Sequence, residues 1–456
     1  MSLSKFESML KTNNVYFFDS VEFEEIIQYY LDNGKHSLAK KAVKLGLEQH
    51  PSSVILKLLK VELLVFEDKL QKASALISEL EAVEPNNEDL LIQKATILSK
   101  NNKHLEAINT FKQVLPNTNE KVDIWSMIGM EYLYLDDFEN ARLNFANCID
   151  VDFEDYSSLY NVVYCFDMEN NHEEAIEFLN NYIDTNPYCE VAWHQLGRQY
   201  FVLKRYEEAL RAFDFAVIID EGFVGGYLEK AKTLEELEQY EKAIENYLIT
   251  LELDDATAFV YVRTGECYQV LGDLETAVKY YKKAVNEDPL LDKGWLLLTN
   301  LFQEDEQYQK ALYYLSKVLQ IDEDNPMYWR KCAEINLKLN FYEETVKAFH
   351  KCLELEDDSI EVFVGLADVL LFLGEFDEAL KIMVKAKNTY KESAEIEYRL
   401  SGLFMLANEE KYCLLHLKNG LAIDAEYREI VSELYPTVFE NEKVQSIIHN
   451  YLKATE

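Results

Sequence analysis

Histidines, cysteines and paired carboxylates are the residues of this chain that could do chemistry, and their spacing builds no recognisable site. Among the 8 histidines, His36, His104, His172 and His194 stand far apart and none belongs to a zinc-binding H-E-x-x-H motif. The phosphate-binding, dinucleotide-binding and nucleophile-elbow glycine motifs are missing too. Two neighbouring acidic residues do not indicate a catalytic site in a chain with 83 Asp and Glu residues. The sequence therefore predicts a protein that is not an enzyme and has no metal site and no cofactor.

The 7 cysteines follow a spacing that indicates packing rather than chemistry. Cys148 and Cys352 are separated by a multiple of thirty-four residues, as are Cys165 and Cys267, and Cys413 stands where other copies of the same spacing carry alanine. No C-x-x-C pair occurs, and an odd count does not close a disulfide framework. We expect small buried thiols in a reducing compartment, not metal ligands or nucleophiles.

Alanine, or a close substitute, recurs every thirty-four residues along most of the chain. The series is Ala39, Ala73, Ala107, Ala141, Ala175, Ala209, Ala243, Ala277, Ala311, Thr345, Ala379 and Cys413. No insertion, deletion or Pro/Gly/Ser-rich linker interrupts it, so residues 20–427 are predicted to form twelve copies of one unit in a continuous stack. Residues 1–19 are expected to form an N-terminal cap, and residues 428–456 are expected to form C-terminal capping helices.

Both ends carry signals for these caps. Asp19 and Glu22 have the spacing of a helix-capping pair, and the apolar segment 15–18 is expected to lie over the first copy. An apolar helical stripe after residue 427 consists of Val444, Ile447, Ile448, Tyr451 and Leu452. A cap is needed because the terminal copies of a stack have a neighbour on one side only.

Every copy holds two apolar periodicities of helical type separated by a short turn. In the copy that begins at residue 190, one face of the first helix carries Trp193, Leu196, Gly197 and Tyr200, and one face of the second carries Ala209, Phe213 and Ala216. Small residues let the two helix axes approach closely, and the aromatic residue fills the adjacent space. Each copy is therefore predicted to be a helical hairpin.

This pattern resembles the tetratricopeptide repeat family, whose signature W-x2-L-G-x2-Y, then A-x3-F-x2-A, is nearly complete in residues 193–216. All 4 tryptophans occupy the same position of their copies, which are Trp125, Trp193, Trp295 and Trp329. The glycine position departs from the signature in weaker copies, for example at Val61 and Val163. The resemblance implies an all-α, right-handed superhelical solenoid of helix-turn-helix repeats. It also implies an inner groove, lined by the first helices, that holds a segment of another protein.

The net charge of −38 limits the classes of partner. Nucleic acids and anionic membranes bind clustered basic residues, so we expect neither as a partner. No window of eighteen apolar residues exists, and the first residues lack the apolar stretch of a secretory signal. The expected partner is a protein or peptide, without membrane insertion, and the expected location is the cytoplasm.

If the family's groove-facing positions apply, cations and tyrosines gather on the inner surface of the fifth to tenth copies. These residues are Tyr160, Tyr164, His194, Arg198, Lys232, Arg263, Lys293, Arg330 and Lys331. Arginine and tyrosine often carry binding energy at interfaces, so one interpretation is a site for an acidic or mixed peptide across the fifth to eighth copies. The alternative is that Glu229, Glu266 and Glu334 neutralise these cations. The family's basic clamp for a C-terminal carboxylate is not found here.

The resulting functional prediction is a non-catalytic adaptor or scaffold that binds a polypeptide segment along the concave groove. Two alternatives stay open. One is a regulatory receptor whose superhelix changes pitch when a peptide binds, and the other is the targeting subunit of a separately encoded enzyme. Reversing Arg198 and Lys232 to Glu is expected to weaken the natural complex without changing the helicity.

Overall fold

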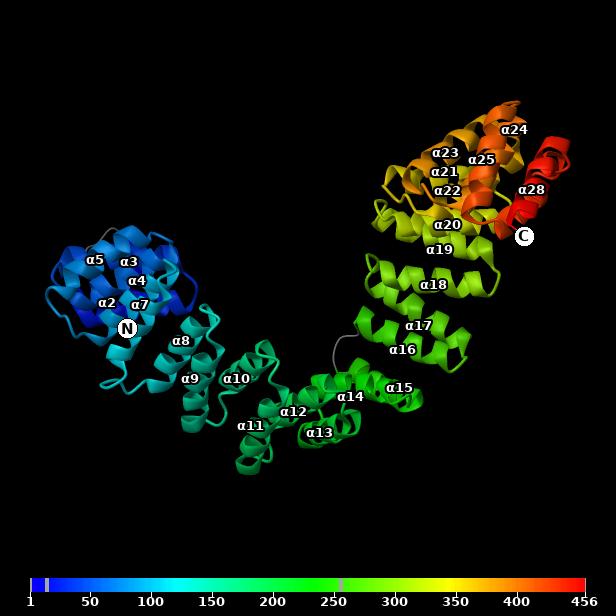
Figure 1. The fold of residues 1–456 in the computed structure, drawn as a ribbon. Coiled ribbons are helices and arrows are strands. Elements are labelled where there is room, and N and C mark those ends of the chain that lie inside the picture. The colour runs from blue at the N-terminus through cyan, green and yellow to red at the C-terminus, as the bar shows by residue number, and fades with distance from the viewer. Residues whose placement is uncertain (1, 13–15, 254–256, 456) are drawn as a thin grey trace. The chain divides into compact units, whose positions relative to one another are not determined.

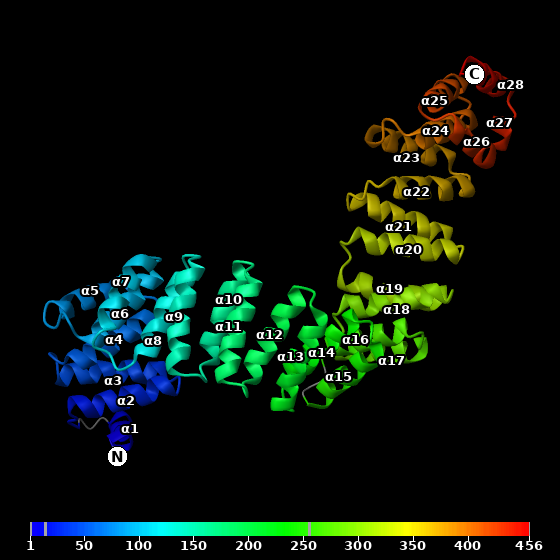
Figure 2. The same cartoon turned by 60° about the horizontal axis from the view of Figure 1, so that its bottom comes forward.

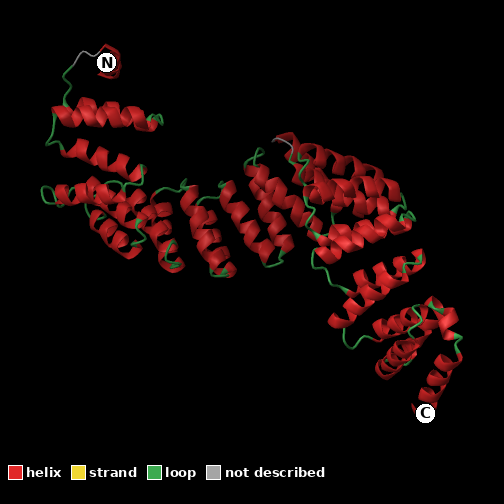
Figure 3. Ribbon diagram, turned by 90° about the horizontal axis from the view of Figure 1, so that it is seen from above, coloured by secondary structure: helices red, strands yellow, loops and turns green. Residues whose placement is uncertain are grey.

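The computed structural model divides into two compact units, Met1–Leu237 and Glu238–Glu456 (Figure 1). Residues 2–12, 16–253 and 257–455 are described, and no strand occurs among them (Figure 3). The all-α fold predicted from the sequence is confirmed, and each unit is a stack of helical hairpins. The division falls inside the copy that begins at residue 224, where the sequence has no linker. The predicted partition into a cap, twelve repeats and a second cap stays a prediction.

In the first unit, α1 (Ser2–Thr12) precedes the hairpins. The first helices of successive hairpins are α2 (Ser20–Asp32), α4 (Val54–Phe66), α6 (Glu88–Lys100), α8 (Lys121–Leu133), α10 (Tyr156–Met168), α12 (Glu190–Val202) and α14 (Val224–Glu236). The second helices are α3 (His36–Gln49), α5 (Leu70–Glu81), α7 (His104–Val114), α9 (Phe138–Val151), α11 (His172–Thr185) and α13 (Tyr206–Ile219). Each second helix contacts the first helix of its own hairpin and that of the next, so the hairpins lie side by side (Figure 2).

The second unit begins with α15 (Tyr240–Leu253) and repeats the same arrangement. Its first helices are α16 (Ala258–Val270), α18 (Asp292–Glu304), α20 (Pro326–Lys338), α22 (Ile360–Leu373) and α24 (Ala394–Leu406). Its second helices are α17 (Leu274–Glu287), α19 (Tyr308–Ile321), α21 (Tyr342–Glu354), α23 (Phe376–Thr389) and α25 (Glu410–Ile423). A 3-10 turn (Glu426–Arg428), α26 (Glu429–Leu434), α27 (Pro436–Phe439) and α28 (Glu442–Thr455) follow.

The alanine series sets the phase of this packing. Every member from Ala39 to Cys413 has an exposed fraction of 0%. The first helices begin thirty-four residues apart from Ser20 to Ala394, except that α8 begins one residue early. Large aromatic residues fill the complementary space, since a Cβ added to Gly197 would lie 2.5 Å from the Phe213 ring. Close approach at this glycine is therefore a packing requirement.

One left-handed residue reverses the chain between the two helices of each hairpin. These residues are Gly34, Asp68, Asn102, Asp136, Asn170, Lys204, Glu238, Gly272, Glu306, Asn340, Gly374 and Asn408. Their φ angles run from 54° at Asn170 to 81° at Gly272. Gly, Asn and Asp adopt this conformation readily, whereas Lys204 and Glu306 adopt it at a cost of about 1 kcal/mol. The repeated packing of the helices on both sides offsets that cost.

Residues at both ends of the described chain pack against the neighbouring hairpins. Asp19 and Glu22 make a reciprocal capping box at the start of α2. Phe18 is buried against Phe6 of α1, with ring centroids 5.9 Å apart, whereas Val15 lies outside the described residues. At the other end, Val444 of α28 is fully buried in the core of the second unit. None of the described helices combines the length and the apolar character needed to cross a bilayer.

Candidate functional site

Two tyrosines and three methionines are exposed on adjacent first helices of the first unit. Tyr160 and Tyr164 lie one turn apart on α10, with exposed fractions of 41% and 47%. Met168 follows one turn later on the same helix and is also exposed. On α8, Met127 and Met130 are spaced three residues apart and are both exposed. Exposed apolar side chains that recur one turn apart, as on α10, mark an interaction surface more often than scattered single residues do.

The groove-facing residues predicted from the sequence include the two tyrosines but not the three methionines. Met127 and Met130 occupy the sixth and ninth positions of the copy that begins at residue 122, and Tyr164 is the ninth residue of the next copy. Apolar side chains at the groove-facing positions point to Met127 and Met130 but not to Met168, which is the thirteenth residue of its copy. Methionine suits a binding surface because its flexible thioether adapts to different partners. We call Met127, Met130, Tyr160, Tyr164 and Met168 the Met/Tyr surface.

Arg198 on α12 is an exposed cation in the hairpin after this surface. Its Nη1 donates a hydrogen bond to Oε1 of Gln195 at 3.3 Å. In the described part of the chain, no carboxylate lies within ion-pair distance of Arg198. The guanidinium is therefore available to a carboxylate or carbonyl group of a partner.

Three of the other predicted groove cations form ion pairs. Lys232 of α14 contacts Glu229 at 2.8 Å, on the same helix. In the second unit, Glu266 pairs with both Arg263, at 2.9 Å, and Lys293, at 2.8 Å. These contacts agree with the alternative that nearby glutamates neutralise these three cations. A lysine or arginine paired in this way offers less charge to a partner than Arg198 does.

Arg330 and Lys331 also have partners within the second unit. Nη2 of Arg330 lies 2.5 Å from Oδ2 of Asp357 and 2.8 Å from Oγ of Ser359. The hydrogen bond to Asp357 raises the pKa of Arg330 above its ordinary value. Nζ of Lys331 donates to Oε1 of Gln303 at 3.2 Å. Both side chains thus take part in contacts between successive hairpins of this unit.

His194 lies in the core beside the surface and does not present its ring nitrogens to solvent. The imidazole lies 5.8 Å from the Phe213 ring and 5.1 Å from the Phe223 ring, centroid to centroid. Both ring nitrogens are buried and have no hydrogen-bond partner among the described residues. Burial lowers the pKa of His194 to about 4, because the protonated form loses its hydration.

Replacing His194 with Phe is expected to remove part of the acid sensitivity of the first unit. The folded-state pKa lies below the ordinary value of about 6.5, so the unfolded chain binds more protons between these two pH values. Unfolding therefore becomes easier as the pH falls, by about 2 kcal/mol between pH 7 and pH 5 for this one group. Hydrogen exchange in α12 and α13, corrected for its intrinsic pH dependence, measures the difference. If His194→Phe shows the same pH dependence as the unaltered chain, His194 is not a source of this acid sensitivity.

Groups that could do chemistry elsewhere in the chain lack the surroundings for it. All 7 cysteines are free and buried. Burial raises the pKa of the Cys165 and Cys332 thiols to about 11, which disfavours the nucleophilic thiolate. No cluster of three or more His, Cys, Asp or Glu side chains in the described residues could hold a metal ion.

Comparisons with known proteins agree with the hairpin architecture. Tetratricopeptide repeat models match residues 228–292 and residues 122–155. A comparison with the curated proteins gives no match.

Several solved structures share the helical hairpins at low identity. The C-terminal part of a TPR repeat-containing protein from Cytophaga hutchinsonii is 15% identical, with 56% of this chain and 98% of that chain covered and a TM-score of 0.43. YrrB, a TPR protein with an unusual peptide-binding site, is 14% identical over 40% of this chain and 95% of its own, with a TM-score of 0.35. The MamA protein is 19% identical over 37% of this chain and 92% of its own, with a TM-score of 0.34. The two sequence matches and the thirty-four-residue phase of the buried alanines show that this chain contains tetratricopeptide repeats.

Proposed function

We propose that this protein is a non-catalytic adaptor or scaffold that holds a polypeptide segment of another protein against α8, α10 and α12. Proteins built from such repeats generally bind other proteins on their extended surfaces. The observation that carries the proposal is the Met/Tyr surface next to Arg198, an exposed cation without a carboxylate partner in the described residues. Tyrosine and arginine are enriched among the residues that dominate binding energy.

The chemistry of the surface defines the segment that fits it. Methionine and tyrosine side chains bury apolar groups, so the segment must present apolar side chains to α8 and α10. Arg198 adds a recognition point for a carboxylate at the α12 end. The acidic overall charge of −38 opposes nucleic acid, so a polypeptide is the proposed partner. The proposed site lies within the first unit, and the paired cations Arg263 and Arg330 are not part of it.

Reversing the charge of Arg198 is expected to weaken binding at least about tenfold, which corresponds to about 1.4 kcal/mol. Glu at this position repels a carboxylate of the segment, whereas the fold is unaffected because the side chain is exposed. The ligands are peptides selected from a display library against the full chain, with affinities measured by fluorescence anisotropy. Arg211→Glu is the matched control, since Arg211 is an exposed arginine on α13, the second helix of the same hairpin.

Two outcomes would contradict the proposed function. One is that Arg198→Glu and Arg211→Glu bind the selected peptides with the affinity of the unaltered chain. The other is that the library yields no peptide that binds the chain. Circular dichroism and thermal melting of both variants establish that a loss of affinity does not come from unfolding.

A further inference from the structure

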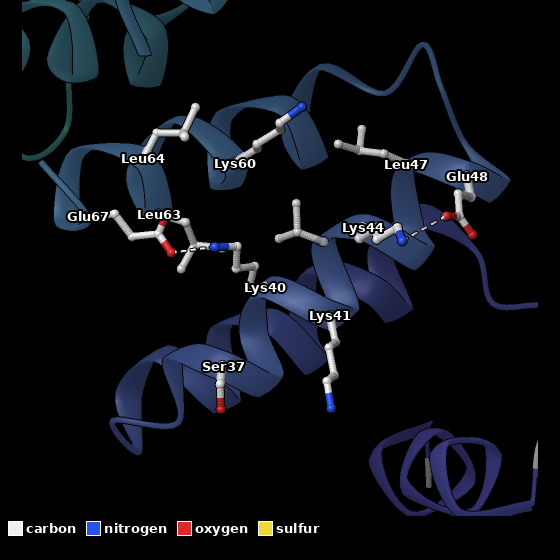
Figure 4. Close-up of a pocket in the computed structure, with 11 residues that line it drawn as sticks. Ser37, Lys40, Lys41, Lys44, Leu47, Glu48, Lys60, Leu63, Leu64 and Glu67 are labelled. Carbon is white, nitrogen blue, oxygen red and sulfur yellow. Dashed lines mark hydrogen bonds and ion pairs between the residues drawn. The ribbon is translucent and has the colours of Figure 1, made fainter. Parts of the chain in front are cut away.

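A hollow of about 610 Å³ lies between α3 and α4, at the junction of the first two hairpins (Figure 4). Its apolar wall is formed by Val43 and Leu47 of α3 and by Leu63 and Leu64 of α4. Four lysines surround this wall, namely Lys40, Lys41, Lys44 and Lys60, together with Glu48 and Glu67, which pair with Lys44 and Lys40. An apolar wall with a cationic rim is unusual on a chain whose net charge is −38.

The sequence explains why the hollow forms at this junction. Lys60 is the seventh residue of its copy, and three later copies carry Ile128, Val162 and Leu196 there, all of them buried. Lys40 is the twenty-first residue of its copy, where three other copies carry the buried Ile108, Ile176 and Ile244. A lysine keeps its ammonium group in water, so the space that aliphatic residues fill elsewhere stays open here.

At the first junction, acidic side chains do not form ion pairs with all of the lysines. Three other junctions carry one basic residue at one of the two positions, and each is ion-paired: Lys94 with Glu81 at 2.7 Å, Arg142 with Glu169 at 2.5 Å and Lys230 with Asp214 at 2.8 Å. At the first junction, Lys40 pairs with Glu67 at 2.6 Å. Lys41 and Lys60 are exposed, and the described residues give neither of them an ion pair. Two lysines to which the described residues give no ion pair therefore stand at the rim of an apolar hollow, and an acid that acts on Lys60 is Glu79, which pairs with Lys57.

The opposite side of α4 has a different character. Glu62 lies two residues after Lys60, which places it nearly opposite on the helix. There it lines a separate hollow with Glu24 of α2 and Asp89 of α6. Burial, followed by the nearby charge of Asp32, raises the pKa of Glu62 above its ordinary value. An acidic ligand is thus repelled from that side and attracted to the α3/α4 hollow.

We propose that the α3/α4 hollow is a second docking site, separate from the Met/Tyr surface, for an acidic amphipathic helix of a partner protein. Its aliphatic side chains pack on Leu47, Leu63 and Leu64, which supplies most of the affinity. Its carboxylates face Lys41 and Lys60, which supplies orientation and selects acidic over basic partners. The proposal goes beyond the proposed function, because it concerns other helices of the first unit and another partner geometry.

The probe for this site is a synthetic helical peptide with leucine at every third or fourth position on one face and glutamate on the other face. Fluorescence anisotropy with the full chain is expected to show binding, and Lys41→Glu/Lys60→Glu is expected to weaken it at least about tenfold. The matched control is Lys282→Glu/Lys381→Glu, which makes the same charge change at two exposed lysines of α17 and α23. That control and Arg198→Glu are expected to bind the probe like the unaltered chain.

Four results would overturn the second docking site. The first is that the unaltered chain does not bind the peptide up to about 1 mM, and the second is that Lys41→Glu/Lys60→Glu binds it as tightly as the unaltered chain. The third is that a peptide with lysine in place of every glutamate binds equally well. The fourth is that these two lysines support charge-dependent binding to phosphatidylserine vesicles in place of peptide binding. Since both lysines are exposed, the double variant is expected to keep its helicity and melting temperature. Loss of probe binding with Arg198→Glu unaffected separates this site from the Met/Tyr surface.

Discussion

Replacing both Tyr160 and Tyr164 with alanine lowers the affinity for the selected peptides at least about 100-fold, or about 2.7 kcal/mol. The two rings lie one turn apart on α10 and are both accessible, so one bound segment can contact both. Truncating a central tyrosine removes a large apolar contact together with its hydroxyl hydrogen bond. The effect exceeds that of Arg198→Glu because an exposed charge at the edge of an interface contributes less than a covered ring.

The control for this variant is Tyr188→Ala/Tyr313→Ala. Tyr188 is 84% exposed in the turn before α12, and Tyr313 is exposed on α19 of the second unit. Both pairs remove two exposed tyrosines, so loss of affinity in the α10 pair alone locates the binding surface. A comparable loss in the two pairs, or no loss in either, would mean that α10 is not the binding helix.

Replacing Glu397 with alanine destabilises the C-terminal hairpins of the second unit by about 3 kcal/mol. Glu397 on α24 is 1% exposed. Its Oε1 lies 2.5 Å from Nζ of Lys387 on α23, and its Oε2 lies 2.5 Å from Nδ1 of His416 on α25. One carboxylate thus joins three consecutive helices. Removing it leaves two partners without their acceptor and creates a cavity.

The pKa of Glu397 determines how its contribution to stability changes with pH. Burial raises the pKa of this carboxyl, but hydrogen bonds from His416 and Lys387 outweigh burial, and the net pKa lies below its ordinary value. The ionised carboxylate therefore stabilises the fold above the ordinary pKa of a glutamate. This contribution is lost as the pH falls through the lowered folded-state pKa. Glu397→Gln is expected to lack this part of the acid dependence.

Hydrogen exchange in α23, α24 and α25 measures both effects locally, which suits a stack whose repeats unfold without passing through one two-state transition. The matched control is Glu275→Ala, because the pair of Glu275 with Lys279 is almost fully solvated and contributes less than about 1 kcal/mol. Equal protection in Glu397→Ala and Glu275→Ala would show that the buried carboxylate does not hold these helices together.

The hairpin architecture could be predicted because one short-range requirement recurs at a fixed spacing. Each residue of the alanine series is fully buried, and only the small side chains of Ala, Thr and Cys occupy these positions. The capping pair Asp19 and Glu22 was predictable for a similar reason, since it depends on contacts within one turn of helix. The left-handed turns at Lys204 and Glu306 carry no such local signal, because the packing on both sides imposes them.

The candidate site was only partly predictable, since pairing between helices is not visible in a single sequence. The groove-facing positions of Tyr160, Tyr164 and Arg198 follow from the resemblance to the repeat family. Their exposure, and the pairing of Arg330 with Asp357 twenty-seven residues later, depend on how neighbouring hairpins pack. The ion pairs of Glu397 could not be predicted for the same reason. Glu397 stands at the position where other copies carry tryptophan, and its two partners lie on the helices before and after it.

Hydroxyl-radical footprinting of the full chain with and without a selected peptide tests the central claim most directly, because methionine and tyrosine side chains are readily oxidised when exposed. The account predicts that the peptide protects Met127, Met130, Met168, Tyr160 and Tyr164, while Met327, which is 53% exposed on α20, is oxidised as before. Unchanged oxidation of the Met/Tyr surface in the saturated complex, with protection elsewhere, would contradict it.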